Sequence, residues 1–120
     1  MATGRLTTHV LDTMLGGPAT GLGVTLWRLD GEGRPSLLTE TRTNADGRTG
    51  RPLLQGAELE AGRYELSFAV GDYYAEQGVA LPDPPFLDLV PIWFGVADIS
   101  ATYHVPLLVG PWSFATYRGS

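Results

Sequence analysis

The sequence predicts an all-β domain built as a β-sandwich, and three observations carry that prediction. Short segments that alternate apolar and polar side chains recur along the whole chain, which is the period of half-buried strands. Turn-forming residues separate these segments, and the 16 glycines and 9 prolines suit a chain of many short strands. Only one segment departs from the alternation in the manner of a helix. Because 120 residues suffice for one core, residues 1–120 are expected to form a single domain.

The first half of the chain contains four predicted strands. They occupy residues 6–13, 23–30, 36–43 and, as a short piece, 52–54. A loop rich in glycine and proline follows the first strand at 14–21, and the Gly-Glu-Gly sequence at 31–33 is typical of a hairpin turn. A further turn at 43–48 contains Asp-Gly, a strong turn dipeptide.

The one predicted helix follows the strand expected at residues 63–70. Residues 72–78 lose the alternation of that strand. Asp72 can cap the amino end of a helix, and Gly78 can end it in the left-handed conformation that glycine favours. Seven residues span roughly two turns at 3.6 residues a turn, so the helix is expected to be short.

The last third of the chain returns to strands. Residues 86–97 predict a long apolar strand, in which Pro91 indicates a strand start or a bulge. Tyr103, Val105, Leu107 and Val109 alternate with a second face that carries His104, which predicts a strand with two different faces. Gly-Pro at 110–111 turns the chain into a final strand at 112–117, for about eight strands in all.

Composition excludes several classes of function. The net charge of −5 and the absence of a basic stripe argue against a nucleic-acid partner. The absence of cysteine excludes disulfides and Cys-based zinc sites. No apolar run approaches a membrane span, and the amino-terminal residues lack the apolar stretch of a secretory signal. We therefore expect a soluble, cytoplasmic protein without a membrane partner.

Four polar side chains are candidates for chemistry, although each also has a structural explanation. His9 lies within the first strand and, taken alone, is typical of a structural hydrogen bonder. Arg48 lies in a predicted turn, where it can be merely solvated. Arg118 and Ser120 lie at the end of the sequence, where they can fray into solvent.

Three motifs together resemble the 5-hydroxyisourate hydrolases, the transthyretin-related enzymes of urate breakdown. LTTHVLDT occupies residues 6–13, TNADGR occupies 43–48, and YHVPLL at 103–108 is followed by TYRGS at 116–120. YRGS at this place is the most specific mark of that family. Motifs from opposite ends of one chain that match one family are far less probable by accident than either motif alone.

The resemblance covers essentially the whole chain and implies the transthyretin fold, an all-β sandwich of two four-stranded sheets with one short helix. It implies a homotetramer with active sites where subunits meet. The implied reaction is the opening of the 5-hydroxyisourate ring to 2-oxo-4-hydroxy-4-carboxy-5-ureidoimidazoline in urate catabolism. No cofactor is implied, and no metal is predicted, because two histidines without neighbouring carboxylates or cysteines make a poor zinc site.

The resemblance also implies roles for individual residues. His9, Arg48 and His104 form the catalytic set; the histidines orient and deprotonate water, which suits neutral imidazole near pH 7. Which histidine accepts the proton stays open. The arginines bind substrate oxygens and stabilise developing negative charge. The substrate-binding residues implied in this way are His9, Arg48, Tyr117, Arg118, Gly119 and Ser120.

The sequence departs from the family at one place and leaves two other classes of function open. The family ending usually reads SP…YSTYRGS, whereas this chain has Gly110 and Pro111, and Ala115 in place of the serine. Thr116 and Ser113 are the hydroxyls that can substitute. The first alternative function is a transthyretin-like protein that carries small ligands without catalysis, and the second is a generic β-sandwich interaction module. The three motifs favour the hydrolase.

Overall fold

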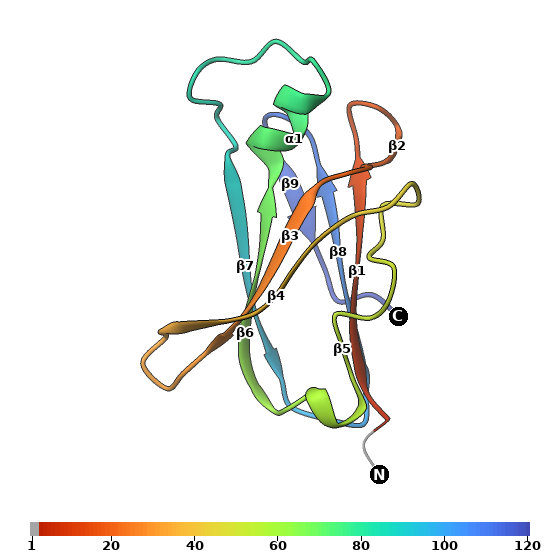
Figure 1. Ribbon diagram of the computed structural model, residues 1–120, viewed down its shortest axis with the longest axis vertical. Helices are drawn as coiled ribbons and strands as arrows, with labels where there is room; N and C mark the ends of the chain where they lie inside the picture. Colours follow the sequence, from red (N-terminus) through yellow and green to blue (C-terminus); the bar gives the residue numbers. More distant parts are fainter. Residues whose placement is uncertain (1–2) are drawn as a thin grey trace.

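The computed structural model describes residues 3–120, which form two β-sheets packed face to face and one short α-helix (Figure 1). The strands are β1 (Arg5–Asp12), β2 (Gly17–Pro18), β3 (Gly23–Leu29), β4 (Pro35–Arg42), β5 (Leu54–Gln55), β6 (Gly62–Ala69), β7 (Leu89–Val96), β8 (Thr102–Val109) and β9 (Phe114–Thr116). The helix α1 spans Val70–Glu76, and a 3₁₀ turn spans Gly56–Glu58.

The predicted sandwich of two sheets is confirmed. One sheet has the order β2-β1-β8-β9, and the two-residue β5 pairs with β1 as its fifth member. The other sheet has the order β4-β3-β6-β7. We call these the first and the second sheet. Every pairing is antiparallel except that of β1 with β8, which is parallel.

The core lies between the inner faces of the two sheets. In β1 every second residue is buried, and Leu6 and Val10 are fully enclosed. Leu66 and Phe68 of β6 meet them from the second sheet, again with no exposed surface. This alternation leaves the other face of the first sheet for polar residues, among them Thr7 and His9, which are half-buried.

Two local predictions are wrong. The helix begins at Val70 rather than at Asp72, and its N-cap is Ala69, which offers no side-chain hydrogen bond. The chain passes directly from β6 into α1, and the helix buries Val70, Gly71, Tyr73 and Tyr74 against the core. Pro91 marks neither a strand start nor a bulge, since β7 pairs with β6 in unbroken register through it. It is tolerated because β7 is an edge strand.

A buried carboxylate ties the end of β1 to α1. Asp12 is 2% exposed. Its oxygens accept hydrogen bonds from the hydroxyls of Tyr73 and Tyr74, each at 2.8 Å, and from the backbone N–H groups of Met14 and Leu15 at 2.9 and 3.1 Å. Burial, and next the hydrogen bond to Asp12, raise the pKa of both tyrosines. Both therefore stay neutral donors throughout the working pH range.

Among residues 3–120, no helix is both long and apolar enough to cross a membrane.

Replacement of Asp12 by Ala is expected to lower the free energy of unfolding by about 3 kcal/mol, because the buried Tyr73 hydroxyl loses its acceptor and the Tyr74 hydroxyl keeps only the backbone oxygen of Val109. Urea unfolding followed by tryptophan fluorescence measures this change. The matched control is Asp72→Ala, which removes an exposed carboxylate of α1 and should cost well under ~1 kcal/mol. Equal unfolding midpoints for the two variants would contradict the structural role of Asp12.

Candidate active site

The two ends of the chain meet because β1 and β8 pair in parallel. Thr7 lies opposite His104, and His9 lies opposite Pro106. Residues paired in this way point to the same face of a sheet, and residues two apart share that face. The structure therefore brings both predicted histidines together on the outer face of the first sheet.

Arg48 joins this face from the turn that precedes β5. It forms an isolated antiparallel bridge with His9, so the two side chains lie on the same face. The predicted turn at 43–48 is confirmed and positions it: the Oδ1 atom of Asn44 accepts from the N–H groups of Asp46 and Arg48 at 2.9 and 3.2 Å. Gly47 completes the turn with a φ of +75°, a conformation that favours glycine.

The ring of His9 is oriented by the same turn. Its Nε2 atom lies 2.8 Å from the backbone oxygen of Asp46. A carbonyl oxygen can only accept, so Nε2 carries a hydrogen and donates it. In the neutral ring Nδ1 is then an unprotonated acceptor. The Cδ2 edge of the ring faces Gly47, where an added Cβ would lie 3.3 Å from Cδ2.

The ring of His104 is held between two neighbours. Its Nδ1 atom lies 2.8 Å from the Oγ1 atom of Thr7. On its other edge a Cβ added to Gly119 would lie 2.5 Å from Cδ2, so only glycine fits there. The Gly119 N–H also donates to the backbone oxygen of His104 at 2.7 Å. These contacts leave Nε2 as the ring nitrogen available to a ligand.

The pKa of His104 is lowered from its ordinary value of 6.5. Burial is the largest cause, followed by the positive charge of Arg48 and then by repulsion from His9 in its protonated form. His104 is therefore neutral at pH 7, with a lone pair on one of its ring nitrogens.

The C-terminal residues divide between the two faces of the first sheet. β9 pairs with β8 at Leu108↔Ala115, and the bridge His104↔Gly119 continues the same register. By alternation Ala115 and Gly119 lie on the histidine face, whereas the guanidinium of Arg118 lies on the other side, where Tyr117 lines a hollow with it. The methyl group of Ala115 leaves no hydroxyl at the position of the family serine. The Thr116 hydroxyl donates to the Pro106 backbone oxygen at 2.7 Å.

Arg118 is thus the predicted site residue that the structure does not bring to the histidines. Its guanidinium carbon lies 4.3 Å from the ring centroid of Tyr103, a residue of the inner face of β8. Ser120 is exposed beyond Gly119. The substrate-binding roles of both residues stay predictions. Thr7 and Gly47 are site residues that sequence reasoning missed; the signal for Thr7 was its place two residues before His9 on the same strand face.

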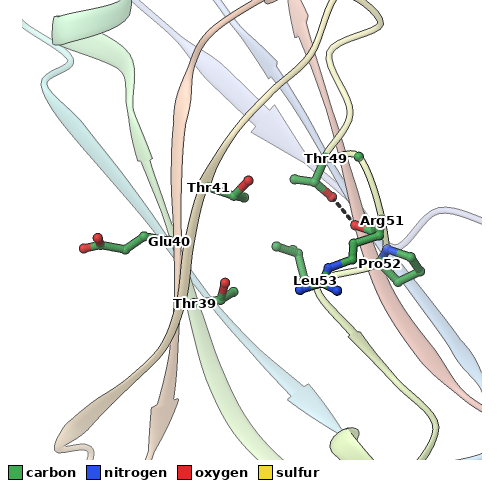
Figure 2. A pocket seen from close by; sticks show the side chains of 8 residues that line it. Thr39, Glu40, Thr41, Thr49, Arg51, Pro52 and Leu53 are labelled. Carbon is green, nitrogen blue, oxygen red and sulfur yellow. Dashed lines mark hydrogen bonds between the residues drawn. The ribbon is translucent and has the colours of Figure 1, made fainter.

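A separate hollow of about 290 Å³ lies between β4 and the segment from Thr49 to Leu53. Figure 2 shows Thr39 and Thr41 pointing across it toward that segment, while Glu40 points away. None of the predicted site residues lines it. Among residues 3–120, no three histidine, aspartate or glutamate side chains group in a way that would hold a metal ion.

Replacement of Arg48 by Met is expected to raise the pKa of His104 toward 6.5, because a positive charge that opposes protonation of the ring is removed. Titration of the histidine ring signals by NMR measures this shift. The control is Arg51→Met, which removes a nearby exposed positive charge that does not contribute to the pKa of His104. This substitution should leave the pKa of His104 unchanged. Identical His104 titrations in Arg48→Met and wild type would show that the two groups do not interact.

Comparisons with known proteins place the chain in a family. The model of the HIUase/Transthyretin family matches residues 6–119. The chain is 61% identical over 117 residues to the 5-hydroxyisourate hydrolase of Ralstonia nicotianae, covering 98% of this chain and 99% of that protein. The structure of Klebsiella pneumoniae 5-hydroxyisourate hydrolase superposes with a TM-score of 0.79 at 34% identity, over 98% of this chain and 94% of that one. Sea bream transthyretin has the same fold, with a TM-score of 0.85 at 23% identity over 96% of this chain and 94% of that one. The chain belongs to the HIUase/Transthyretin family.

Proposed function

We propose that the protein is a 5-hydroxyisourate hydrolase, which opens the ring of its substrate to 2-oxo-4-hydroxy-4-carboxy-5-ureidoimidazoline in urate catabolism. The observation that carries this proposal is the gathering of His9, Arg48 and His104 on one sheet face. Relatives that carry this enzyme name match nearly the full length of the chain at 50 to 61% identity. The enzyme name of the relatives and the three residues on this sheet face therefore both support the proposed reaction.

The histidines supply the base for a water molecule. His9 presents Nδ1 as an acceptor because its Nε2–H is engaged by the Asp46 carbonyl oxygen. His104 stays neutral because its pKa is lowered, and its Nε2 atom can hold or orient the same water. The Thr7 hydroxyl can donate to Nδ1 of His104 or accept from it, so it allows either tautomer of that ring. We assign proton abstraction to His9 and water orientation to His104.

Arg48 supplies positive charge where negative charge develops. Water adds to the carbonyl carbon of the ring amide, and its proton passes to the imidazole. The carbonyl oxygen then carries negative charge, which a guanidinium stabilises with up to two parallel hydrogen bonds. The C–N bond of the ring breaks as the proton returns to the departing nitrogen. All three groups come from the histidine face, so no cofactor is needed in this scheme.

The substitutions His9→Asn and His104→Asn are each expected to lower kcat by about 10²–10⁴-fold, the range for loss of general-base help. Neither substitution should prevent folding. The assay follows the ultraviolet absorbance of freshly made 5-hydroxyisourate with and without protein. Arg51→Met, which changes a residue outside the histidine face, is the control. Wild-type protein that fails to accelerate decay of the absorbance would reject the hydrolase, and ligand binding without turnover would favour the carrier alternative.

We also propose that the protein is a cytoplasmic homotetramer with active sites at subunit interfaces. The histidine face is the outer surface of a sheet, so a single sandwich gives it no opposite wall. Large apolar side chains are exposed near its end, among them Leu15 at 66% and Trp112 at 60%. A second copy facing the first sheet would cover these side chains and enclose the substrate.

Sedimentation should give a species of four times the 12.9 kDa chain at assay concentration. Leu108 is half-buried on the histidine face beside Ala115, so Leu108→Glu is expected to dissociate the tetramer and lower kcat by about tenfold or more, because the site loses its opposite wall. Glu40→Gln on the exposed side of β4 is the control for a charge change. A monomer with full wild-type turnover would contradict the shared site.

A further inference from the structure

We infer that Arg118 is a positioning residue: by lying on the ring of Tyr103, it holds the C-terminal residues so that Gly119 packs against the imidazole of His104. Arg118 then acts through the histidine and does not bind substrate itself. This inference deepens the proposed hydrolase function and rests on it, because it assigns a mechanical task to one residue of the predicted substrate-binding set.

The contact that holds Arg118 is built on a rigid surface. The guanidinium lies 4.3 Å from the ring centroid of Tyr103, and its Nη2 atom lies 3.4 Å from the Thr102 backbone oxygen. Tyr103 is itself 6% exposed, and its hydroxyl accepts from the N–H groups of Ala97 and Asp98 at 3.0 and 2.9 Å. A cation over a fixed aromatic face is a favourable and directional contact.

Arg118 and Gly119 act on opposite sides of the same strand. Successive residues of an extended chain point to opposite faces, so anchoring the guanidinium on the inner side presses the next residue toward the outer side. There the Gly119 backbone contacts the His104 ring, while Thr7 holds Nδ1 from the other edge. Loss of the anchor removes one of the two neighbours that set the orientation of the ring.

The same alternation argues against direct contact of Arg118 with a substrate at the histidines. On its own side the guanidinium borders a hollow of about 370 Å³ between β7 and the end of the chain, lined also by Phe94, Tyr103 and Tyr117. Neither histidine lines that hollow. A substrate that met both Arg118 and His104 would have to contact both faces of β8 at once.

A double-mutant cycle with Arg118→Met and Tyr103→Leu tests the inference. Each change alone should lower kcat by about tenfold or more through misplacement of the ring, with KM changed by less than about twofold. The double variant should be no worse than either single one, because both remove the same contact. Arg63→Met, which removes an exposed arginine of β6, is the control and should stay close to wild type.

NMR titration of His104 in the absence of substrate gives a second measurement, which does not depend on turnover. Burial lowers the pKa of this ring, and the charges that act on it are Arg48 and His9. Tyr103→Leu leaves those charges and Arg118 in place, so a rise of the His104 pKa toward 6.5 would report a more exposed ring. Arg118→Lys also keeps the charge but loses the planar contact, and it should show a smaller rise.

The outcomes distinguish a positioning role of Arg118 from direct binding of substrate by Arg118. If Arg118→Met raises KM with kcat unchanged while Tyr103→Leu alters neither, Arg118 binds substrate and the inference is wrong. Should Tyr103→Leu not fold, the comparison of Arg118→Lys with Arg118→Met decides by the same two readouts. Because the titration needs no substrate, an unchanged His104 pKa in an active enzyme rejects the positioning role alone, whereas an inactive wild type rejects the hydrolase.

Discussion

The parallel pairing of β1 with β8 is the constraint on which the site depends. It joins segments 97 residues apart and places Thr7 beside His104. A slip of one residue in this register would turn every side chain of one strand to the opposite face. The buried hydroxyl of Thr8 resists such a slip, since it donates to the Val105 backbone oxygen at 2.7 Å. The pairing register of β1 and β8 therefore also fixes the geometry of the site.

Electrostatics at the site run against the charge of the whole chain. The protein carries a net charge of −5, yet the outer face of the first sheet gathers an arginine and two imidazoles. Arg48 opposes protonation of the neighbouring His104 imidazole, and in the proposed reaction the same charge stabilises negative charge on the substrate. The buried negative charge of Asp12 lies at the far end of β1 and is occupied by four donors. Opposite charges are thus kept at different positions along one strand.

Much of the fold and of the candidate site could be predicted from the sequence, because the features concerned depend on local patterns. Alternation in β1 and β8 gave the two faces of each strand, and Asp-Gly gave the turn that carries Arg48. The start of α1 escaped prediction because burial of Val70, a tertiary effect, decided it over the capping preference of Asp72. The place of Pro91 depended on β7 being an edge strand, which no local pattern reveals. Thr7 escaped because its partner His104 is defined only by the long-range pairing.

The two glycines beside the imidazoles have a consequence for acidity. Many enzymes orient a catalytic histidine with a carboxylate, whose negative charge also makes the ring a stronger base and favours its protonation. Here the orienting partners are a backbone oxygen, a hydroxyl and the bare backbone of Gly47 and Gly119. None of these carries a negative charge, so both rings gain a fixed direction without a neighbouring carboxylate. Burial and Arg48 lower the pKa of His104, so this ring keeps its lone pair in mildly acidic conditions where a carboxylate-supported histidine is already protonated.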